Sequence, residues 1–256
     1  MTWRQVLVGG LLVGVALGCA PGSSKETSGP PPGTTGGVQA QAPQKPEEAQ
    51  PAAPNLPNAL RHRGLGLYGL TNTRELSYQM TQGGGTPTTG TQTVKFEGIK
   101  DGKATFRIER SGWLQNQSDV VEAREDGIYV LSSTMGTFDV PALELPSNPE
   151  LGKTWQVKSK MTAGDMSPIL EAVAKIEKEE TIKVKGGEFP ALKVKLTGSI
   201  TLGERKIKLA GNTWYSDGIG MVKQELTNEE GGNKQTIVVE LLEIQDQPST
   251  ESSTKQ

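Results

Sequence analysis

Cysteine and histidine are both scarce in this 256-residue chain, and each scarcity removes a class of function. The only cysteine is Cys19, so the chain has no intramolecular disulfide, no thiolate metal cluster and no CxxC redox pair. The only histidine is His62, so a zinc site would have to be built almost entirely from carboxylates. The net charge is −2 and the sequence shows no basic stripe, which argues against a nucleic-acid partner.

Sequence signatures of catalysis are missing as well. There is no G-x-S-x-G elbow for a nucleophilic serine and no G-x-x-x-x-G-K-[ST] phosphate loop. The glycine-rich run at 64–69 has no predicted strand before it and no predicted helix after it, as a dinucleotide fingerprint would require. His62 lies between two arginines, which disfavour its protonated form. We therefore predict no catalytic residue, no metal site and no cofactor.

Long apolar runs are also rare, and the one that stands out leads to Cys19. Arg4 precedes an apolar stretch from Val6 to Leu17, which is followed by Gly18 and Cys19. This layout resembles a bacterial lipoprotein signal, in which the peptide is cut before the cysteine and the cysteine is acylated. The resemblance implies a signal peptide over 1–18, lipidation at Cys19 and a membrane partner reached through that lipid. In a bacterium with two membranes it implies the outer membrane, facing the periplasm.

Two other interpretations of this segment remain open. A permanent membrane helix needs about 20 apolar residues, more than the twelve from Val6 to Leu17. An ordinary secretory signal cut after Gly18 would leave Cys19 as an unpaired thiol in an oxidising compartment. Export is common to the lipoprotein and secretory interpretations.

The segment after Cys19 has too few apolar residues to join a core. Residues 19–58 are rich in Pro, Gly, Ser, Thr, Gln and Ala, a composition that cannot offset the entropy lost on ordering. We predict a disordered tether there, and a disordered tail over 246–256. The β domain is predicted between them, over 59–245, a length sufficient for one hydrophobic core.

Apolar and polar residues alternate throughout the predicted domain. Ala104, Phe106 and Ile108 share one face of a strand, and the same period of two recurs around residues 192–197, 206–209 and 237–241. Alternation with one apolar face is typical of antiparallel sheets. Glycine-containing turns separate the runs, at 101–102, 126–127, 186–187, 217–218 and 231–232.

The fold class that follows is mainly β, with about ten strands in a curved antiparallel sheet or half-open barrel. Parallel βαβ units are excluded because no long helical segments separate the strands. One stretch breaks the pattern: Ser167 can cap a helix, Pro168 suits its first turn, and apolar residues follow at helical spacing. We predict a short helix near 167–175.

Three stretches together carry a family resemblance. They read LGKTW at 151–155, VKGGEFPALKV at 184–194 and TWYSDGIGMVKQE at 213–225. In this order they resemble a family of uncharacterised bacterial envelope lipoprotein domains, similar in outline to the half-barrel lipoprotein carriers of the periplasm. The resemblance implies a fold and a compartment, but no catalytic residues. We expect its aromatic residues, Trp155, Phe189 and Trp214, to face the apolar side of the sheet as core or as a pocket lining.

The sequence leaves three functional hypotheses open. The first is a non-enzymatic envelope lipoprotein whose concave apolar face binds an apolar ligand, a glycan or an envelope protein. The second is a structural or assembly factor whose concavity is filled by its own side chains. The third is a carboxylate-dependent hydrolase, which requires paired acids in a cleft.

Overall fold

The computed structural model describes residues 5–6, 15–16, 54–112 and 117–245. The predicted lipidation site Cys19, nearly all of the predicted signal peptide, the tether up to residue 53 and the tail 246–256 lie outside the described residues. Two very short strands, β1 (Gln5–Val6) and β2 (Val15–Ala16), pair with each other. No described helix is long and apolar enough to cross a membrane.

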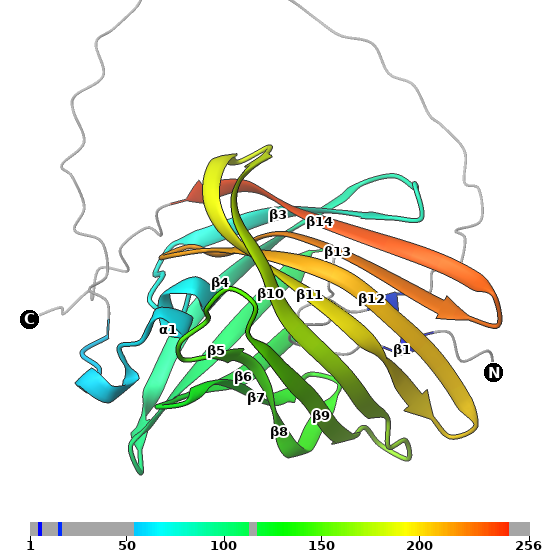
Figure 1. Ribbon diagram of the computed structural model, residues 1–256, viewed down its shortest axis with the longest axis horizontal. Coiled ribbons are helices and arrows are strands. Elements are labelled where there is room, and N and C mark those ends of the chain that lie inside the picture. Colours follow the sequence, from blue (N-terminus) through cyan, green and yellow to red (C-terminus); the bar gives the residue numbers. More distant parts are fainter. Residues whose placement is uncertain (1–4, 7–14, 17–53, 113–116, 246–256) are drawn as a thin grey trace, which may run out of the picture.

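Twelve antiparallel strands form a closed barrel, so the predicted sheet is continuous around its axis (Figure 1). Each strand pairs with the strands before and after it in sequence, as β9 does with β10. The last strand, β14, pairs with the first, β3, and this pairing closes the barrel. The predicted mainly β, antiparallel fold is confirmed. The barrel is closed, whereas the sequence predicted a curved sheet or a half-open barrel. The strands are β3 (Glu75–Gln82), β4 (Thr88–Lys100), β5 (Lys103–Gly112), β6 (Gln117–Arg124), β7 (Gly127–Ser133), β8 (Gly136–Pro146), β9 (Thr154–Thr162), β10 (Ile169–Val184), β11 (Gly187–Leu202), β12 (Arg205–Ser216), β13 (Gly220–Glu230) and β14 (Asn233–Gln245).

Residue alternation determines which side chains enter the barrel. On β5, Ala104, Phe106 and Ile108 are almost fully buried while the residues between them are partly exposed. On β9 the pattern is strict, with every second residue from Trp155 to Met161 buried. Because successive side chains point to opposite faces of a strand, the buried set lines the interior and the other set forms the outer wall.

The predicted helix near 167–175 is wrong, because this segment is the first half of strand β10. Leu170, Ala172 and Ala174 are buried, whereas Ile169 and Val173 are 37% and 49% exposed. The sequence fits both periods, since apolar residues occupy inward and outward positions alike. Pairing decides the outcome: β10 is hydrogen-bonded to β9 on one side and to β11 on the other, which an isolated helical turn could not match.

The one α-helix among the described residues lies instead in the glycine-rich run, as α1 (Arg63–Tyr68), preceded by the 3-10 turn η1 (Asn58–Leu60). His62 is its N-cap, and Gly69 ends it with φ of 78°. A side chain at Gly69 would also collide with the carbonyl of Ile219. Both the positive φ and this close approach therefore require glycine at this position. The helix packs at one end of the barrel, against β7, β8, β12 and β13.

The segment around α1 is anchored by leucines. Leu60, Leu65, Leu67 and Leu70 are each no more than 3% exposed, and Leu56 is 4% exposed. Residues 54–72 therefore form a plug that covers one mouth of the barrel. The plug includes residues 54–58, which the sequence assigned to the tether.

The far half of the β10–β11 hairpin leaves the barrel as an arm (residues 178–193). A register shift between Ile176 and Lys178 bends the hairpin at its base. Its tip reaches β14, where the backbone N–H of Gly186 donates to the carbonyl of Leu241 at 2.9 Å. Figure 1 shows the arm rising past the ends of β12 and β13 toward β14 and β3.

The β8–β9 junction has the least backbone pairing in the barrel. These strands pair only at Thr137 with Thr162 and Phe138 with Met161. Farther along, side chains replace the ladder: the hydroxyl of Ser159 donates to the carbonyl of Val140 at 2.6 Å.

Candidate functional site

The interior of the barrel is packed with its own side chains. One apolar cluster joins Leu145, Trp155, Ile176, Leu192 and Leu209, and a second surrounds Phe106 and Ile128, together with the plug leucines Leu60 and Leu65. Most of these side chains are less than 5% exposed. The apolar inner face that the sequence predicts is therefore covered by the side chains of the barrel strands and by the leucines of the plug.

A charged pair lies among these apolar residues. Arg110 on β5 and Asp119 on β6 form a salt bridge with their side chains 13% and 1% exposed, and the guanidinium Nε also donates to Gln92 at 2.9 Å. Burial alone would lower the pKa of Arg110, but the adjacent carboxylate of Asp119 outweighs it and the net shift of the pKa is upward. Arg110 therefore keeps its positive charge inside the barrel.

Beside this pair remains a small hollow of about 30 Å³. Its lining includes Arg110, Gln92, Gln224 and the rings of Tyr68 and Tyr215, whose centroids are 6.1 Å apart. A space of this size holds about one water molecule and no lipid chain. Burial raises the pKa of Tyr215, and the nearby Glu144 raises it further, so this phenol remains protonated.

A larger hollow, the mouth groove, lies between the plug and the base of the arm, with a volume of about 390 Å³. Its apolar part comes from Leu67 of α1, from residues 190–192 of β11 and from Tyr215. Its polar part comes from Arg63, from residues 179–181 of β10, and from Ser216 at the end of β12 with the following Asp217. The plug, the β10–β11 hairpin and the end of β12 thus meet around one opening.

Charged side chains join the two sides of the mouth groove. The guanidinium of Arg63 on α1 pairs with Glu179 on the arm. The indole N–H of Trp214 donates to the carboxylate of Glu180 at 2.9 Å. Hydrogen bonds from Lys178 and then Trp214 lower the pKa of Glu180, so this acid is ionised and is no proton donor at neutral pH.

The acids of the groove do not form a metal site. Within residues 54–112 and 117–245, no three His, Cys, Asp or Glu side chains are arranged to hold a metal ion. Glu179 and Glu180 each have a cationic or N–H partner. The groove therefore offers an apolar floor with a charged rim, a surface suited to recognition.

The three aromatic residues predicted from the sequence occupy two different places. Trp155 lies in the interior, 9% exposed, and its indole N–H donates to the carbonyl of Leu143 across the β8–β9 junction at 3.2 Å. Trp214 lies on the outer side of β12, where the ammonium groups of Lys193 and Lys223 sit 5.4 and 5.6 Å from its ring centroid. Phe189 belongs to the arm and packs in the same cluster as Trp214. They do not line one pocket.

His62 has a structural position at the start of the plug. Its Nδ1 accepts from the backbone N–H of Leu65 at 3.2 Å, and its Nε2 lies 2.9 Å from the carbonyl of Arg124. A ring that accepts at Nδ1 and donates at Nε2 is neutral. Burial lowers the pKa of His62, more than the Arg124 carbonyl and Asp126 raise it.

Most residues that line the mouth groove were not predicted from the sequence. Arg63, Glu179 and Asp217 belong to distant segments, and only the bend in β10 and the seating of α1 bring them together. The hydrogen bond from Gly218 to the carbonyl of Gly66, at 3.0 Å, shows how closely the plug meets the β12–β13 turn. The glycine spacing in residues 64–69 was the one available signal that this segment packs tightly.

Comparison with known proteins finds one family model that is similar to part of the chain. Residues 133–238 match the DUF3108-like family model. The matched range contains all three stretches on which the resemblance rested, and it runs from β7 to β14. No curated protein matches the chain.

The chain is similar to two solved structures. A candidate lipoprotein from Parabacteroides distasonis is 14% identical with a TM-score of 0.53, over 70% of this chain and 98% of its own. A candidate exported protein with a YmcC-like fold, from Bacteroides fragilis, is 15% identical with a TM-score of 0.41, over 68% of this chain and 96% of its own. At this identity the first likeness concerns the fold alone.

Proposed function

We propose that this chain is a lipid-anchored protein of the bacterial cell envelope, tethered through Cys19, whose barrel is a non-enzymatic binding module. The apolar run that ends at Cys19 supports the anchor. The match to the DUF3108-like family and the fold shared with a candidate lipoprotein support the compartment.

The observation that carries the binding role is the contrast between the interior and the mouth. The interior beside Arg110 retains a hollow of only about 30 Å³, whereas the mouth groove measures about 390 Å³. Two other surface hollows, of about 480 and 440 Å³, have no aromatic side chain in their lining, which the mouth groove has in Tyr215. Ligand sites in proteins usually occupy about 300–1,000 Å³ and combine apolar walls with a few polar groups. Binding is therefore assigned to the mouth groove, and its occupant is an amphipathic molecule or a segment of an envelope protein.

Filling the groove tests this assignment. Thr181 is exposed and lines the groove, so Thr181→Arg should block an occupant without disturbing the core. Thr154→Arg on β9, also exposed, is the matched control. The chain would be crosslinked in its own host and the adducts identified by mass spectrometry. An adduct lost in Thr181→Arg and kept in Thr154→Arg supports the groove, and an adduct equally retained by both variants contradicts it.

The second candidate is an assembly factor with no small ligand. The packed interior favours it, because a barrel filled by Trp155, Phe106 and its neighbours needs no guest to be stable. For this candidate the crosslinked adducts would be proteins only, with no lipid or small molecule among them.

Hydrolysis has less support than either. A glycosidase pairs an ionised carboxylate with a second acid that retains its proton at working pH. In the mouth groove, the pKa of Glu180 is lowered, and Glu179 is held by Arg63. We expect background rates with ester, glycosidic, peptide and phosphoester substrates, and a rate abolished by Glu180→Gln would contradict this.

A further inference from the structure

The outer wall of β9–β12 carries a patch of lysines that the mouth groove does not use. Alternation directs these side chains outward, and the patch is exposed to solvent. We name it the lysine wall, and it consists of Lys158, Lys160, Lys175, Lys195, Lys206 and Lys208. Glu171 and Glu177 are the acids among them, in a chain whose overall charge is −2.

Several of these charges are incompletely balanced. Within the described residues, Lys175 and Lys206 form no salt bridge, and Lys195 shares Glu177 with Lys193, at 3.6 and 3.0 Å. Asp139 and Glu229, at the borders of the patch, pair with Lys160 and Lys208. The excess positive charge therefore centres on Lys175, Lys195 and Lys206.

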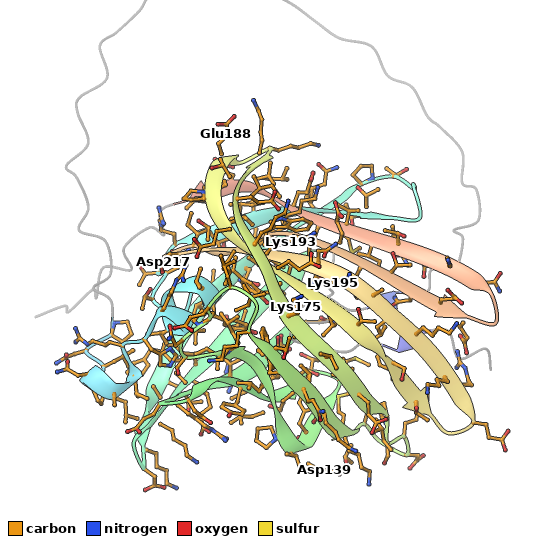
Figure 2. All side chains as sticks on the ribbon, in the orientation of Figure 1. Asp139, Lys175, Glu188, Lys193, Lys195 and Asp217 are labelled. Atoms are coloured by element: carbon orange, nitrogen blue, oxygen red, sulfur yellow. The ribbon has the colours of Figure 1, made fainter. Side chains whose placement is uncertain are left out.

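The register places two of these lysines directly opposite each other. Lys175 on β10 is paired with Lys195 on β11, and Figure 2 shows both on the same part of the wall. Like charges at opposed positions destabilise a sheet. A barrel that keeps such a pair on its surface has a local excess of charge that an anionic partner would relieve.

Next to this pair runs a neutral strip with an exposed apolar residue. In register across the strands lie Gln156, Val173, Thr197 and Ala210, and Val173 is 49% exposed. Ile169, two positions before Glu171, is 37% exposed. Lysines thus flank a shallow apolar centre, which matches a surface with phosphate charges above and hydrocarbon beneath.

We infer that the lysine wall docks the barrel onto an anionic phospholipid surface. The inference rests on the proposed anchoring at Cys19, because a lipid anchor would hold the barrel close to the bilayer, where a basic patch is attracted to anionic lipids. Each lysine close to an anionic bilayer contributes roughly 1 kcal/mol, which amounts to about a fivefold change in affinity. The ammonium groups would meet lipid phosphates while Val173 and Ile169 face the acyl boundary.

The test uses the mature chain from residue 19 with Cys19→Ser, so that no lipid is attached and the anchor plays no part. Sedimentation with mixed phosphatidylglycerol and phosphatidylcholine vesicles is compared with pure phosphatidylcholine vesicles. We expect binding to the anionic vesicles only, weakened by added salt. Equal binding to both vesicles, or binding to neither, would overturn the inference.

Charge reversal locates the surface. Lys175→Glu with Lys195→Glu should weaken vesicle binding at least about tenfold. The matched control is Lys100→Glu with Lys103→Glu, an exposed pair that is likewise opposed in register, at the β4–β5 turn. Equal losses in both double variants would assign the effect to net charge and contradict the lysine wall. Preferential binding to soluble polyphosphate over the vesicles would exclude the membrane as the partner.

Failure of this experiment and failure of the proposed anchoring are separable. Anchoring is measured by the membrane fraction of the natural chain and depends on Cys19. Vesicle docking is measured on a chain without that cysteine. Melting temperatures of the variants confirm that each remains folded.

Discussion

At the residue scale, the barrel interior depends on one charged pair whose partners cannot be removed singly. Asp119 is buried and the side chain of Arg110 is only 13% exposed, and each is the other's counter-ion. Removing one partner of a buried pair typically costs about 3–5 kcal/mol, whereas replacing both by apolar residues is often neutral or stabilising.

A double-mutant cycle follows from this pair. Asp119→Leu should lower the free energy of unfolding by about 3–5 kcal/mol, because the guanidinium of Arg110 loses its counter-ion. Adding Arg110→Met should recover most of that loss. Urea unfolding measures both. Losses that simply add would mean that the two charges act independently.

His62 gives the chain a predictable pH dependence. Burial lowers its pKa in the folded state below the ordinary 6.5, so the unfolded chain binds the proton more readily. Stability from His62 is therefore complete above about pH 6.5 and is lost as the pH falls toward the lowered pKa. His62→Asn keeps an N-cap acceptor without titrating, so its unfolding free energy should fall less between neutral and mildly acidic pH. Identical pH profiles for both chains would contradict the assignment.

The proposed lipid anchoring depends on Cys19. If it is acylated, the natural chain should be in the membrane fraction, and Cys19→Ser should move to the soluble fraction or accumulate uncleaved. Fractionation with detergent extraction measures this. A Cys19→Ser chain that is cleaved normally and still partitions fully with membranes in high salt would contradict lipid anchoring.

At the element scale, alternation predicted the strands because each one has a buried and an exposed face. It failed at 167–175, where Ile169 and Val173 are apolar on the outward face and imitate a helical stripe. Local sequence cannot reveal that β9 and β11 lie on either side of β10. The helix α1 escaped prediction for the opposite reason, since its glycines disfavour a helix and only packing against Asp217 and Ile219 holds them there.

The plug is an element of the fold and not part of the tether. Leu56 and Leu60 are 4% and 0% exposed, and full burial of each leucine contributes about 1.5–3 kcal/mol. A chain that starts at Pro54 should match the mature chain in unfolding free energy, and one that starts at Arg61 should lose about 3–6 kcal/mol. Chemical denaturation of the two chains checks this. Equal stability would show that the plug leucines add nothing to the fold.

At the scale of the whole molecule, the sequence predicted an apolar concavity but could not show what fills it. The filling depends on closure of the barrel through the pairing of β14 with β3 and on the fold of residues 54–72 back into the mouth. Both are contacts between segments far apart in sequence. The mouth groove was unpredictable for the same reason, because Arg63 and Glu179 are 116 positions apart.

The central claim is that the barrel is filled by its own side chains and acts through its surface. Native mass spectrometry of the mature Cys19→Ser chain, purified from its own host, tests this most directly. We predict that the interior holds no guest, so any molecule that adds mass to the folded protein is bound in the mouth groove and is lost in Thr181→Arg. A bound apolar molecule that survives purification, and that is lost when the interior is narrowed by Ala174→Phe, would contradict it.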